Sequence, residues 1–247
     1  VPNVPNAVTT RSVKNFWIVN QKPVIQNGRG DLLWAGKKLS GSTVIGWSRN
    51  FKKILTEDEK NKIYFINDIS TDAPTIANLS LTFKNLGIRS SGFQKVLIDP
   101  SNDNNLLLQT SDSISVFDIS NNKLTAIEKP SSTITQFAAS PSWFAWTTFD
   151  SKKNISRLNL YNRSSQAQLD DETFADTTLK LDFRNDNELG ILQNDGSFYI
   201  ERIGKNRAEK TASDVKDFSF LLNEDSVAAL ENNSIEIFSF GSENSYW

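Results

Sequence analysis

Residues 179–200 read LKLDFRNDNELGILQNDGSFYI, and this stretch decides the class of fold. Apolar and polar residues alternate from Leu179 to Phe183, and a short apolar segment follows from Leu189 to Leu192. Such segments are typical of β-strands. Asn194-Asp195-Gly196 then separates the second segment from a third one, Ser197 to Ile200. Asn-Asp-Gly between two strands predicts a hairpin, because these residues tolerate the backbone angles of a tight turn.

The same order of segments occurs three more times in the chain. The slot after the tight turn is occupied by Ile114, Ile155, Phe198 and Ile235, with spacings of 41, 43 and 37 residues. A period of about 40 residues with four strands per repeat is typical of the blades of a β-propeller. One blade cannot bury both faces of its sheet alone, so neighbouring blades stack and share an apolar core.

The sequence therefore predicts an all-β protein, a β-propeller of about five four-stranded blades. Residues 1–12 are interpreted as a linker and residues 13–247 as a single propeller domain. The predicted blades are residues 31–92, 93–133, 134–175, 176–215 and 216–247. An N-terminal strand, Asn15 to Val19, is expected to complete the last blade and close the ring, since closure removes exposed sheet edges. The alternative is a sixth, partial blade built from residues 13 to 27.

The first of these predicted blades is longer than the others. Its four expected strands are residues 31–35, 43–47, 62–66 and 76–83. Ile63 precedes Ile114 by 51 residues, which predicts an insertion in this blade. Phe51 to Lys60 is the expected insertion, and a short helical turn is predicted there because the segment is charged and lacks Gly and Pro.

The composition limits the function. The 247 residues contain no His and no Cys, and 27 basic side chains nearly balance 29 acidic ones. Without His or Cys, neither a Ser-His-Asp triad nor a Cys-His pair can form, and no phosphate-binding loop or dinucleotide fingerprint occurs. The charge balance argues against nucleic acid, and the lack of a long apolar segment or a basic run argues against direct membrane contact. The sequence therefore predicts a protein that is not an enzyme and uses no metal and no cofactor.

The first residues suggest that this domain belongs to a longer protein. Val1-Pro2-Asn3-Val4-Pro5-Asn6 is interpreted as an extended linker, because repeated Pro favours extended backbone. The chain contains no Met, even at its first position, which suggests a segment excised or processed from a larger product. Further domains are therefore expected N-terminal to Val1.

Several short motifs carry a resemblance to a known family. They are YFINDIS at 64–70, Pro74, NLSL at 78–81, IDPSN at 98–102 and NLLL at 105–108. Through them residues 60–150 resemble the C-terminal propeller-like region of PEGA-domain proteins from candidate-phyla bacteria such as Saccharibacteria. The resemblance implies a surface-anchored protein in which a cytoplasmic tail, a membrane helix and PEGA modules precede this region. It supplies no catalytic residue, and the PEGA tetrapeptide itself is missing from the chain. The chain also resembles TolB-like and WD40-like propellers more generally, without the Gly-His and Trp-Asp dipeptides of WD40 repeats.

The tryptophans are the candidate binding residues. Trp34, Trp143 and Trp146 lie inside predicted strands, where a place in the core between blades is expected. Trp17 and Trp47 lie near strand ends, where a position on the rim is expected. An aromatic side chain on the rim is a natural anchor for a peptide or a sugar ring.

Paired carboxylates are the one catalytic device that the composition allows. Asp31, Asp99 and Asp182 lie near predicted inner strands, and an enzyme of the glycosidase type would bring such groups within about 5–10 Å of each other. The structural interpretation is favoured, because Asp after an apolar strand commonly bonds its own backbone in a turn. Arg29-Gly30-Asp31 also matches the integrin-binding tripeptide, a match short enough to arise by chance.

The favoured hypothesis is a non-catalytic binding or scaffold propeller that presents a rim face to a protein or a cell-envelope glycan. We expect it to be the surface-exposed part of a larger bacterial protein, anchored by a segment outside this chain. The alternatives are a carboxylate-dependent glycosidase or lyase and a structural spacer domain.

Overall fold

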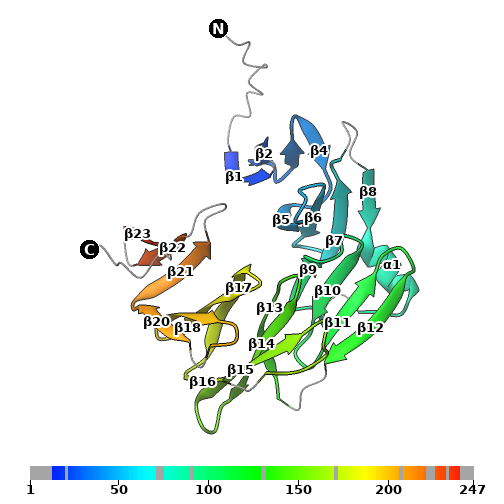
Figure 1. Cartoon of the computed structure of the whole chain (residues 1–247). Coiled ribbons are helices and arrows are strands. Elements are labelled where there is room, and N and C mark those ends of the chain that lie inside the picture. Colours follow the sequence, from blue (N-terminus) through cyan, green and yellow to red (C-terminus); the bar gives the residue numbers. More distant parts are fainter. Residues whose placement is uncertain are drawn as a thin grey trace. The chain divides into compact units, whose positions relative to one another are not determined.

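The described part of the chain is built almost entirely of antiparallel β-sheets (Figure 1). In this computed structural model the described residues are 13–19, 22–70, 75–89, 92–128, 132–169, 172–205, 208–220, 226–231 and 234–239. The chain divides into two compact units, Val1–Lys129 and Pro130–Trp247, each with three sheets. The all-β prediction is confirmed, and the described residues form six sheets, as in the alternative to five.

The unit Val1–Lys129 contains the first three sheets, in which each strand pairs with the next strand of the sequence. The first sheet consists of β1 (Val13–Val19), β2 (Lys22–Asn27), β3 (Leu32–Trp34) and β4 (Lys37–Leu39). The second consists of β5 (Thr43–Trp47), β6 (Lys53–Asp58), β7 (Ile63–Asp68) and β8 (Thr75–Asn78). The third consists of β9 (Lys95–Ile98), β10 (Asn105–Gln109), β11 (Ile114–Asp118) and β12 (Lys123–Glu128).

The unit Pro130–Trp247 repeats this arrangement. The fourth sheet consists of β13 (Ile134–Ala139), β14 (Trp143–Asp150), β15 (Ile155–Asn162) and β16 (Glu172–Ala175). The fifth consists of β17 (Thr178–Asn185), β18 (Glu188–Gln193), β19 (Phe198–Arg202) and β20 (Glu209–Ala212). The described part of the sixth consists of β21 (Val215–Phe220), β22 (Ser226–Glu231) and β23 (Ser234–Ser239).

Apolar side chains from neighbouring sheets form the core within each unit. Val24 and Trp34 of the first sheet meet Ile54 of the second, and Leu55 of the second sheet meets Phe117 of the third. In the other unit, one cluster joins the fourth and fifth sheets, and another joins the fifth and sixth. Within each unit, neighbouring sheets thus bury apolar side chains against each other, as the stacking of repeats predicts.

The first sheet corrects the expected assignment of the N-terminal strands. Residues 31–35 were expected to open the second sheet, but Leu32–Trp34 pairs with β2 and β4. The N-terminal strand was expected to complete the last blade, but β1 pairs with β2 as part of a four-stranded sheet of its own. A sixth blade was the alternative, and it extends to Leu39 rather than ending at residue 27.

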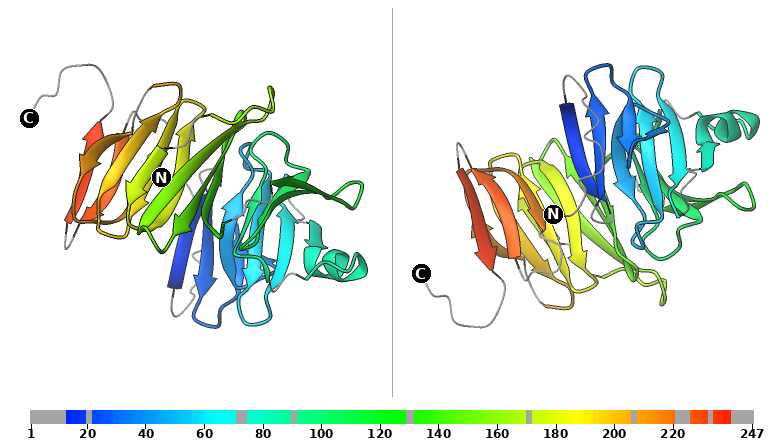
Figure 2. Two further views of the ribbon diagram at one scale, coloured as in Figure 1. Left: turned by 90° about the horizontal axis from the view of Figure 1, so that it is seen from below. Right: turned by 90° about the horizontal axis from the view of Figure 1, so that it is seen from above.

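The insertion in the second sheet lies elsewhere than expected. Phe51 to Lys60 contains strand β6, because Ile54, Leu55 and Thr56 are all buried and only the ends are charged. The helix is α1 (Leu79–Asn85), where a strand was expected. Oδ1 of Asn78 accepts a hydrogen bond from the backbone N–H of Leu81 and caps its first turn. Figure 2 shows α1 beside the second sheet, and the helix contacts β7.

Gly190 provides a direct test of the packing between the fifth and sixth sheets. A Cβ atom at this position would lie 2.6 Å from Cε2 of Phe218 and 2.9 Å from Cζ of Phe220. Because Phe218 is fixed in a core cluster, Gly190→Ala is expected to destabilise the fold by about 1–3 kcal/mol. Urea unfolding followed by circular dichroism measures this change.

Gly46→Ala is the matched control for Gly190→Ala. Gly46 also lies inside a strand, but no atom of the described residues lies within 4 Å of its added Cβ, so a change within about 0.5 kcal/mol is expected. Equal effects of the two substitutions would contradict the close approach of the sheets at Gly190.

Candidate binding surface

The side chain of Ser48 holds the β5–β6 turn in one conformation. Its Oγ accepts a hydrogen bond from the backbone N–H of Lys53 at 2.9 Å and donates one to Oδ1 of Asn50 at 2.8 Å. Phe51 adopts a positive φ of 57°, and its side chain packs against the core between the first and second sheets. The turn therefore presents Arg49 and Asn50 from a fixed backbone.

The β9–β10 turn is fixed by its own polar side chains. Oδ1 of Asp99 accepts hydrogen bonds from the backbone N–H and from Oγ of Ser101, both at 2.9 Å. Oδ1 of Asn102 accepts one from the backbone N–H of Asn104 at 3.0 Å. Asp99 is fully buried and serves the turn, which agrees with the structural interpretation of this residue.

Direct hydrogen bonds join these two turns. Nζ of Lys53 donates to the backbone O of Asp103 at 2.9 Å and to Oδ1 of Asn104 at 2.8 Å. The side-chain amide of Asn50 contacts the carboxylate of Asp103. Between the turns lies an open hollow of about 540 Å³, here called the turn hollow, whose lining residues are Arg49, Asn50, Pro100, Ser101, Asn102, Asp103 and Asn104.

The turn hollow offers polar groups suited to binding a polypeptide. Asparagine amides both donate and accept hydrogen bonds, as the backbone of a bound segment requires. The exposed guanidinium of Arg49 has no hydrogen-bond or ion-pair partner within the part of the chain that the structure describes. Two residues earlier, Trp47 ends β5 with 36% of its surface exposed. Trp and Arg are both among the residue types that are enriched in binding hot spots.

A tripeptide repeat marks the turns that make these contacts. Asn102-Asp103-Asn104 recurs as Asn185-Asp186-Asn187 in the β17–β18 turn. There, Oδ1 of Asp186 accepts hydrogen bonds from Oγ of Ser140 at 2.6 Å and from the backbone N–H of Ser142 at 3.0 Å, both in the preceding β13–β14 turn. Within each unit, this Asp therefore joins its own turn to the turn of the preceding sheet. This role was not predicted from the sequence, although the repeated Asn-Asp-Asn is the signal for it.

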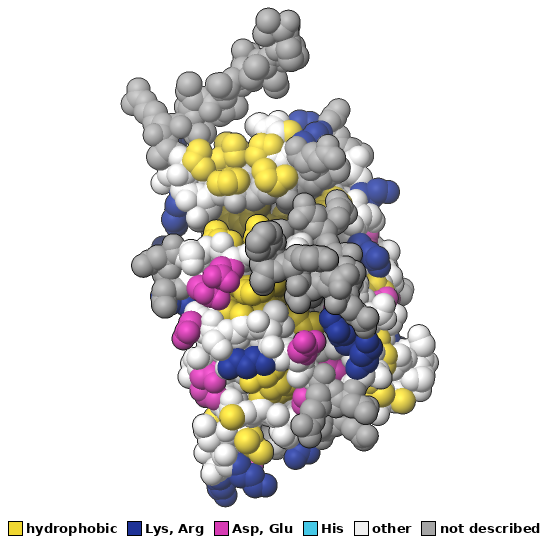
Figure 3. Space-filling view, turned by 60° about the vertical axis from the view of Figure 1, so that its left-hand side comes forward, with side chains coloured by type: hydrophobic (Ala, Val, Ile, Leu, Met, Phe, Trp, Pro, Cys, Tyr) yellow, Lys and Arg dark blue, Asp and Glu magenta, His cyan; other side chains and the backbone are white. Residues whose placement is uncertain are grey.

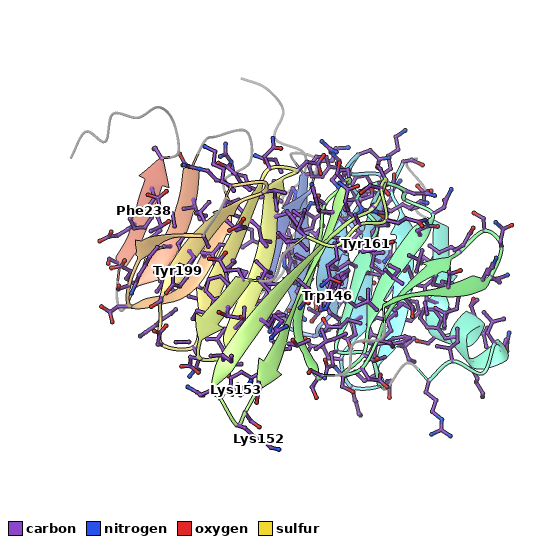
Figure 4. The ribbon with its side chains drawn as sticks, turned by 60° about the horizontal axis from the view of Figure 1, so that its bottom comes forward. Trp146, Lys152, Lys153, Tyr161, Tyr199 and Phe238 are labelled. Atoms are coloured by element: carbon purple, nitrogen blue, oxygen red, sulfur yellow. The ribbon has the colours of Figure 1, made fainter. Side chains whose placement is uncertain are left out.

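The other tryptophans lie in or beside the core. Trp17 is half-buried and packs against the cluster between the first and second sheets. Trp34 and Trp146 are 4% and 2% exposed, as expected for core residues, and Trp143 packs against the cluster of the fourth and fifth sheets. Figure 4 shows Trp146 among the strands and Lys152 and Lys153 at the tip of the β14–β15 hairpin.

The three candidate catalytic Asp residues lie in separate turns and strands. Asp31 accepts from Nζ of Lys38 at 2.6 Å and from the amide of Asn27 at 3.2 Å, and the hydrogen bond of Lys38 lowers the pKa of Asp31. Asp31 is thus held in the β2–β3 turn, where the Arg-Gly-Asp tripeptide also lies. Asp182 lies inside β17, opposite Gly190, in a different unit from Asp31 and Asp99.

A carboxyl pair that the sequence analysis did not single out lies between the fourth and fifth sheets. Glu201 of β19 is 5% exposed, and its side chain is hydrogen-bonded to that of Glu172 of β16. Both carboxylate oxygens of Glu172 accept from the backbone N–H of Ala208 at 3.0 Å. Burial and the Glu172 carboxylate raise the pKa of Glu201 to about 8. Direct contact and burial leave no room for the substrate that a glycosidase holds between its carboxylates.

Two features are absent from the described residues. These residues contain no group of three or more Asp and Glu side chains that could hold a metal ion. They also include no helix that is long and apolar enough to cross a membrane.

No protein-family model and no curated protein matches this sequence, whereas solved structures do. BamB from Moraxella catarrhalis is 13% identical with a TM-score of 0.54, and the match covers 94% of this chain and 70% of BamB. PorZ, an essential surface component of the type-IX secretion system of Porphyromonas gingivalis, is 15% identical with a TM-score of 0.56 over 92% of this chain and 32% of PorZ. The β-propeller domain of Cps50 (Swd1) from Myceliophteria thermophila is 12% identical with a TM-score of 0.53 over 90% and 81%.

At this level of identity the similarity concerns the fold alone. Together with the six antiparallel sheets, it shows that the chain is an all-β protein with the blades of a β-propeller. The predicted fold class is therefore confirmed, with six blades.

Proposed function

We propose that this chain is a non-catalytic propeller that binds a protein partner through Trp47, Arg49 and the turn hollow. The observation that carries this proposal is the guanidinium of Arg49, which lines the turn hollow and has no partner among the described residues, together with the exposed Trp47 two residues earlier in the chain. The fixed turns favour binding, because a surface that is already ordered loses little entropy when a partner docks. A glycan partner, a glycosidase and an inert spacer are the competing roles that the experiment below distinguishes.

Replacing Trp47 or Arg49 by Ala is expected to raise the Kd of the partner at least about 30-fold, as for hot-spot residues, and to leave the fold intact. The partner is sought by pull-down with the wild-type domain from separate protein and polysaccharide fractions of the producing cells' envelope. Binding of the purified partner is then measured by calorimetry, and the unfolding midpoint of each variant is measured in parallel. A partner present at about 100 times its Kd adds about 2.7 kcal/mol to the stability of the wild-type domain.

Lys152→Ala and Lys153→Ala are the matched controls, because these cations lie at the tip of another hairpin. They are expected to bind the partner like the wild type. A partner recovered only from the polysaccharide fraction would assign the hollow to a glycan, and product release from that glycan would assign an enzyme. No binding from any fraction would overturn the proposal and favour the spacer role.

We further infer that the domain belongs to a larger protein exposed on the surface of a bacterium. The resemblance of residues 60–150 to PEGA-domain surface proteins and the structural similarity to PorZ, itself a bacterial surface component, support this location. Protease treatment of intact cells that removes the domain would support it, and full protection of the domain would contradict it.

A further inference from the structure

The β2–β3 turn contains the only Asn-Gly pair of the chain, Asn27-Gly28. The backbone N–H of Gly30 donates to the backbone O of Asn27 at 2.9 Å, and the backbone N–H of Asn27 donates to the backbone O of Asp31 at 3.0 Å. Gly30 has a positive φ of 85°, as a hairpin loop with a glycine bulge requires. Because β2 and β3 pair directly before and after the turn, its backbone is held at both ends.

The side-chain amide of Asn27 is held by groups of the same turn. Its Oδ1 accepts hydrogen bonds from the backbone N–H groups of Arg29 and Asp31, both at 2.9 Å. Its Nδ2 donates to Oδ2 of Asp31 at 3.2 Å. These contacts stabilise the turn, as Asn commonly does. They also fix two hydrogen-bond donors on the oxygen of an amide carbonyl.

Gly28 supplies a nucleophile next to this carbonyl. Its backbone N–H has no acceptor within the part of the chain that the structure describes. Gly28 also has no side chain to hinder the approach of its nitrogen to Cγ of Asn27. Attack of this nitrogen on Cγ develops negative charge on Oδ1, and donors about 2.7–3.1 Å from such an oxygen stabilise the charge. The N–H groups of Arg29 and Asp31, both at 2.9 Å, lie within that range.

We propose that Asn27 is a site of self-modification, at which the folded turn promotes conversion of the side-chain amide to a carboxylate. The backbone nitrogen of Gly28 forms a bond to Cγ of Asn27 and gives up its proton to solvent. The bond from Cγ to Nδ2 breaks, and this nitrogen takes a proton from solvent and leaves as ammonia. Water, the only co-reactant, then opens the resulting succinimide at either carbonyl and leaves an aspartyl or isoaspartyl residue at position 27. Each chain reacts once, so the modification adds to the binding role and involves no turnover.

The modification adds a negative charge beside an existing ion pair. Oδ1 of Asp31 lies 2.6 Å from Nζ of Lys38. A carboxylate at position 27 cannot donate to Asp31 as the amide does, and it competes with Asp31 for the Lys38 cation. Asp31 and Lys38 also line a second open hollow of about 540 Å³, to which Phe65 and Ile76 of the second sheet contribute. The modification therefore changes the charge at the edge of this hollow.

The test compares the folded chain with the same chain unfolded in concentrated guanidinium chloride, at the same neutral pH and temperature. The chain has 27 basic and 29 acidic side chains, and Figure 3 shows both kinds side by side on the surface turned forward. Because these charges nearly balance, ion exchange resolves one added negative charge. Fragmentation of the peptide that contains residues 22–34 then identifies the modified position and its linkage. The folded chain is expected to convert at least as fast as the unfolded chain. A folded chain that keeps its amide while the unfolded chain converts would overturn the proposal.

Gly30→Val tests whether the turn itself promotes the reaction. A branched side chain disfavours the positive φ of Gly30 and displaces the donors on Oδ1, so conversion of the folded chain is expected to slow at least about tenfold. The unfolded chain is expected to convert unchanged, because Gly28 still follows Asn27. Gly36→Val in the β3–β4 turn is the matched control, since both glycines have a positive φ and no described atom within 4 Å of an added Cβ. It is expected to convert like the wild type, and circular dichroism checks that each variant is folded. Equal rates for folded Gly30→Val and the folded wild type would contradict the role of the turn and overturn the proposal.

Discussion

Phe198→Ala is expected to lower the free energy of unfolding by about 3–5 kcal/mol, the largest effect among the apolar truncations considered in this chain. Phe198 begins β19, is fully buried and lies in the cluster that joins the fifth and sixth sheets. Its removal leaves a cavity that hydrogen-bonded strands on both sides cannot close. Urea unfolding followed by circular dichroism, in dilute protein, measures the loss.

Ile235→Ala is the control, because Ile235 occupies the same slot of the repeat in the sixth sheet but is 69% exposed. A change within about 0.5 kcal/mol is expected for an exposed side chain in the dilute protein. A loss as large as that of Phe198→Ala would contradict the exposure of Ile235 and mean that the folded chain buries this side chain.

The contrast between Phe198 and Ile235 shows which part of the fold the sequence could predict. The slot after the tight turn was assigned from turn residues and alternation, which are local signals. Accordingly Ile114, Ile155 and Phe198 are the first residues of β11, β15 and β19. No local signal in the sequence distinguishes Phe198 from Ile235, because the exposure of each side chain depends on whether another sheet packs against it.

The first sheet was misassigned for a different reason. Leu32–Trp34 and Lys37–Leu39 have only three residues each, which is too short for alternation to appear. Residues 31–35 were assigned to the next blade, and the strands Lys22–Asn27 and Lys37–Leu39 were not recognised. The N-terminal strand was therefore left without a partner and was assigned to the last blade. The helix α1 was missed because Leu79 and Phe83, its buried residues, also fit a short apolar strand.

The candidate binding surface was predictable only in part. The exposure of Trp47 agrees with its predicted place near a strand end. The hydrogen bonds from Lys53 to Asp103 and Asn104, by contrast, join residues 50 and 51 positions apart. Contacts over such distances in sequence follow from the stacking of sheets, which the pattern of one strand does not specify.

Glu201→Gln is expected to stabilise the protein above about pH 8 and to have little effect below about pH 4.5. Burial and the neighbouring Glu172 carboxylate raise the pKa of Glu201 from 4.5 to about 8 in the folded protein. Between these two pH values the unfolded chain has released this proton and the folded chain still holds it. The wild type therefore loses stability as the pH rises through this window, and the loss is complete above the folded pKa.

The Gln side chain is neutral at every pH, and its amide can still donate a hydrogen bond to Glu172. The gain from Glu201→Gln is therefore expected to grow with pH to at most about 5 kcal/mol. Urea unfolding of both proteins at a series of pH values measures the difference. Glu236→Gln, at an exposed position of β23, is the control and is expected to give a constant difference near zero.

Parallel stability curves for the wild type and Glu201→Gln would contradict the raised pKa of Glu201. They would also mean that the carboxyl pair does not make the stability of the fold depend on pH. If the curves diverge, the position of the pair has a structural consequence. Glu172 lies on the last strand of the fourth sheet and Glu201 on the third strand of the fifth. Ionisation of Glu201 then places two carboxylates in contact between these sheets, so high pH is expected to weaken the stacking of the fourth sheet on the fifth.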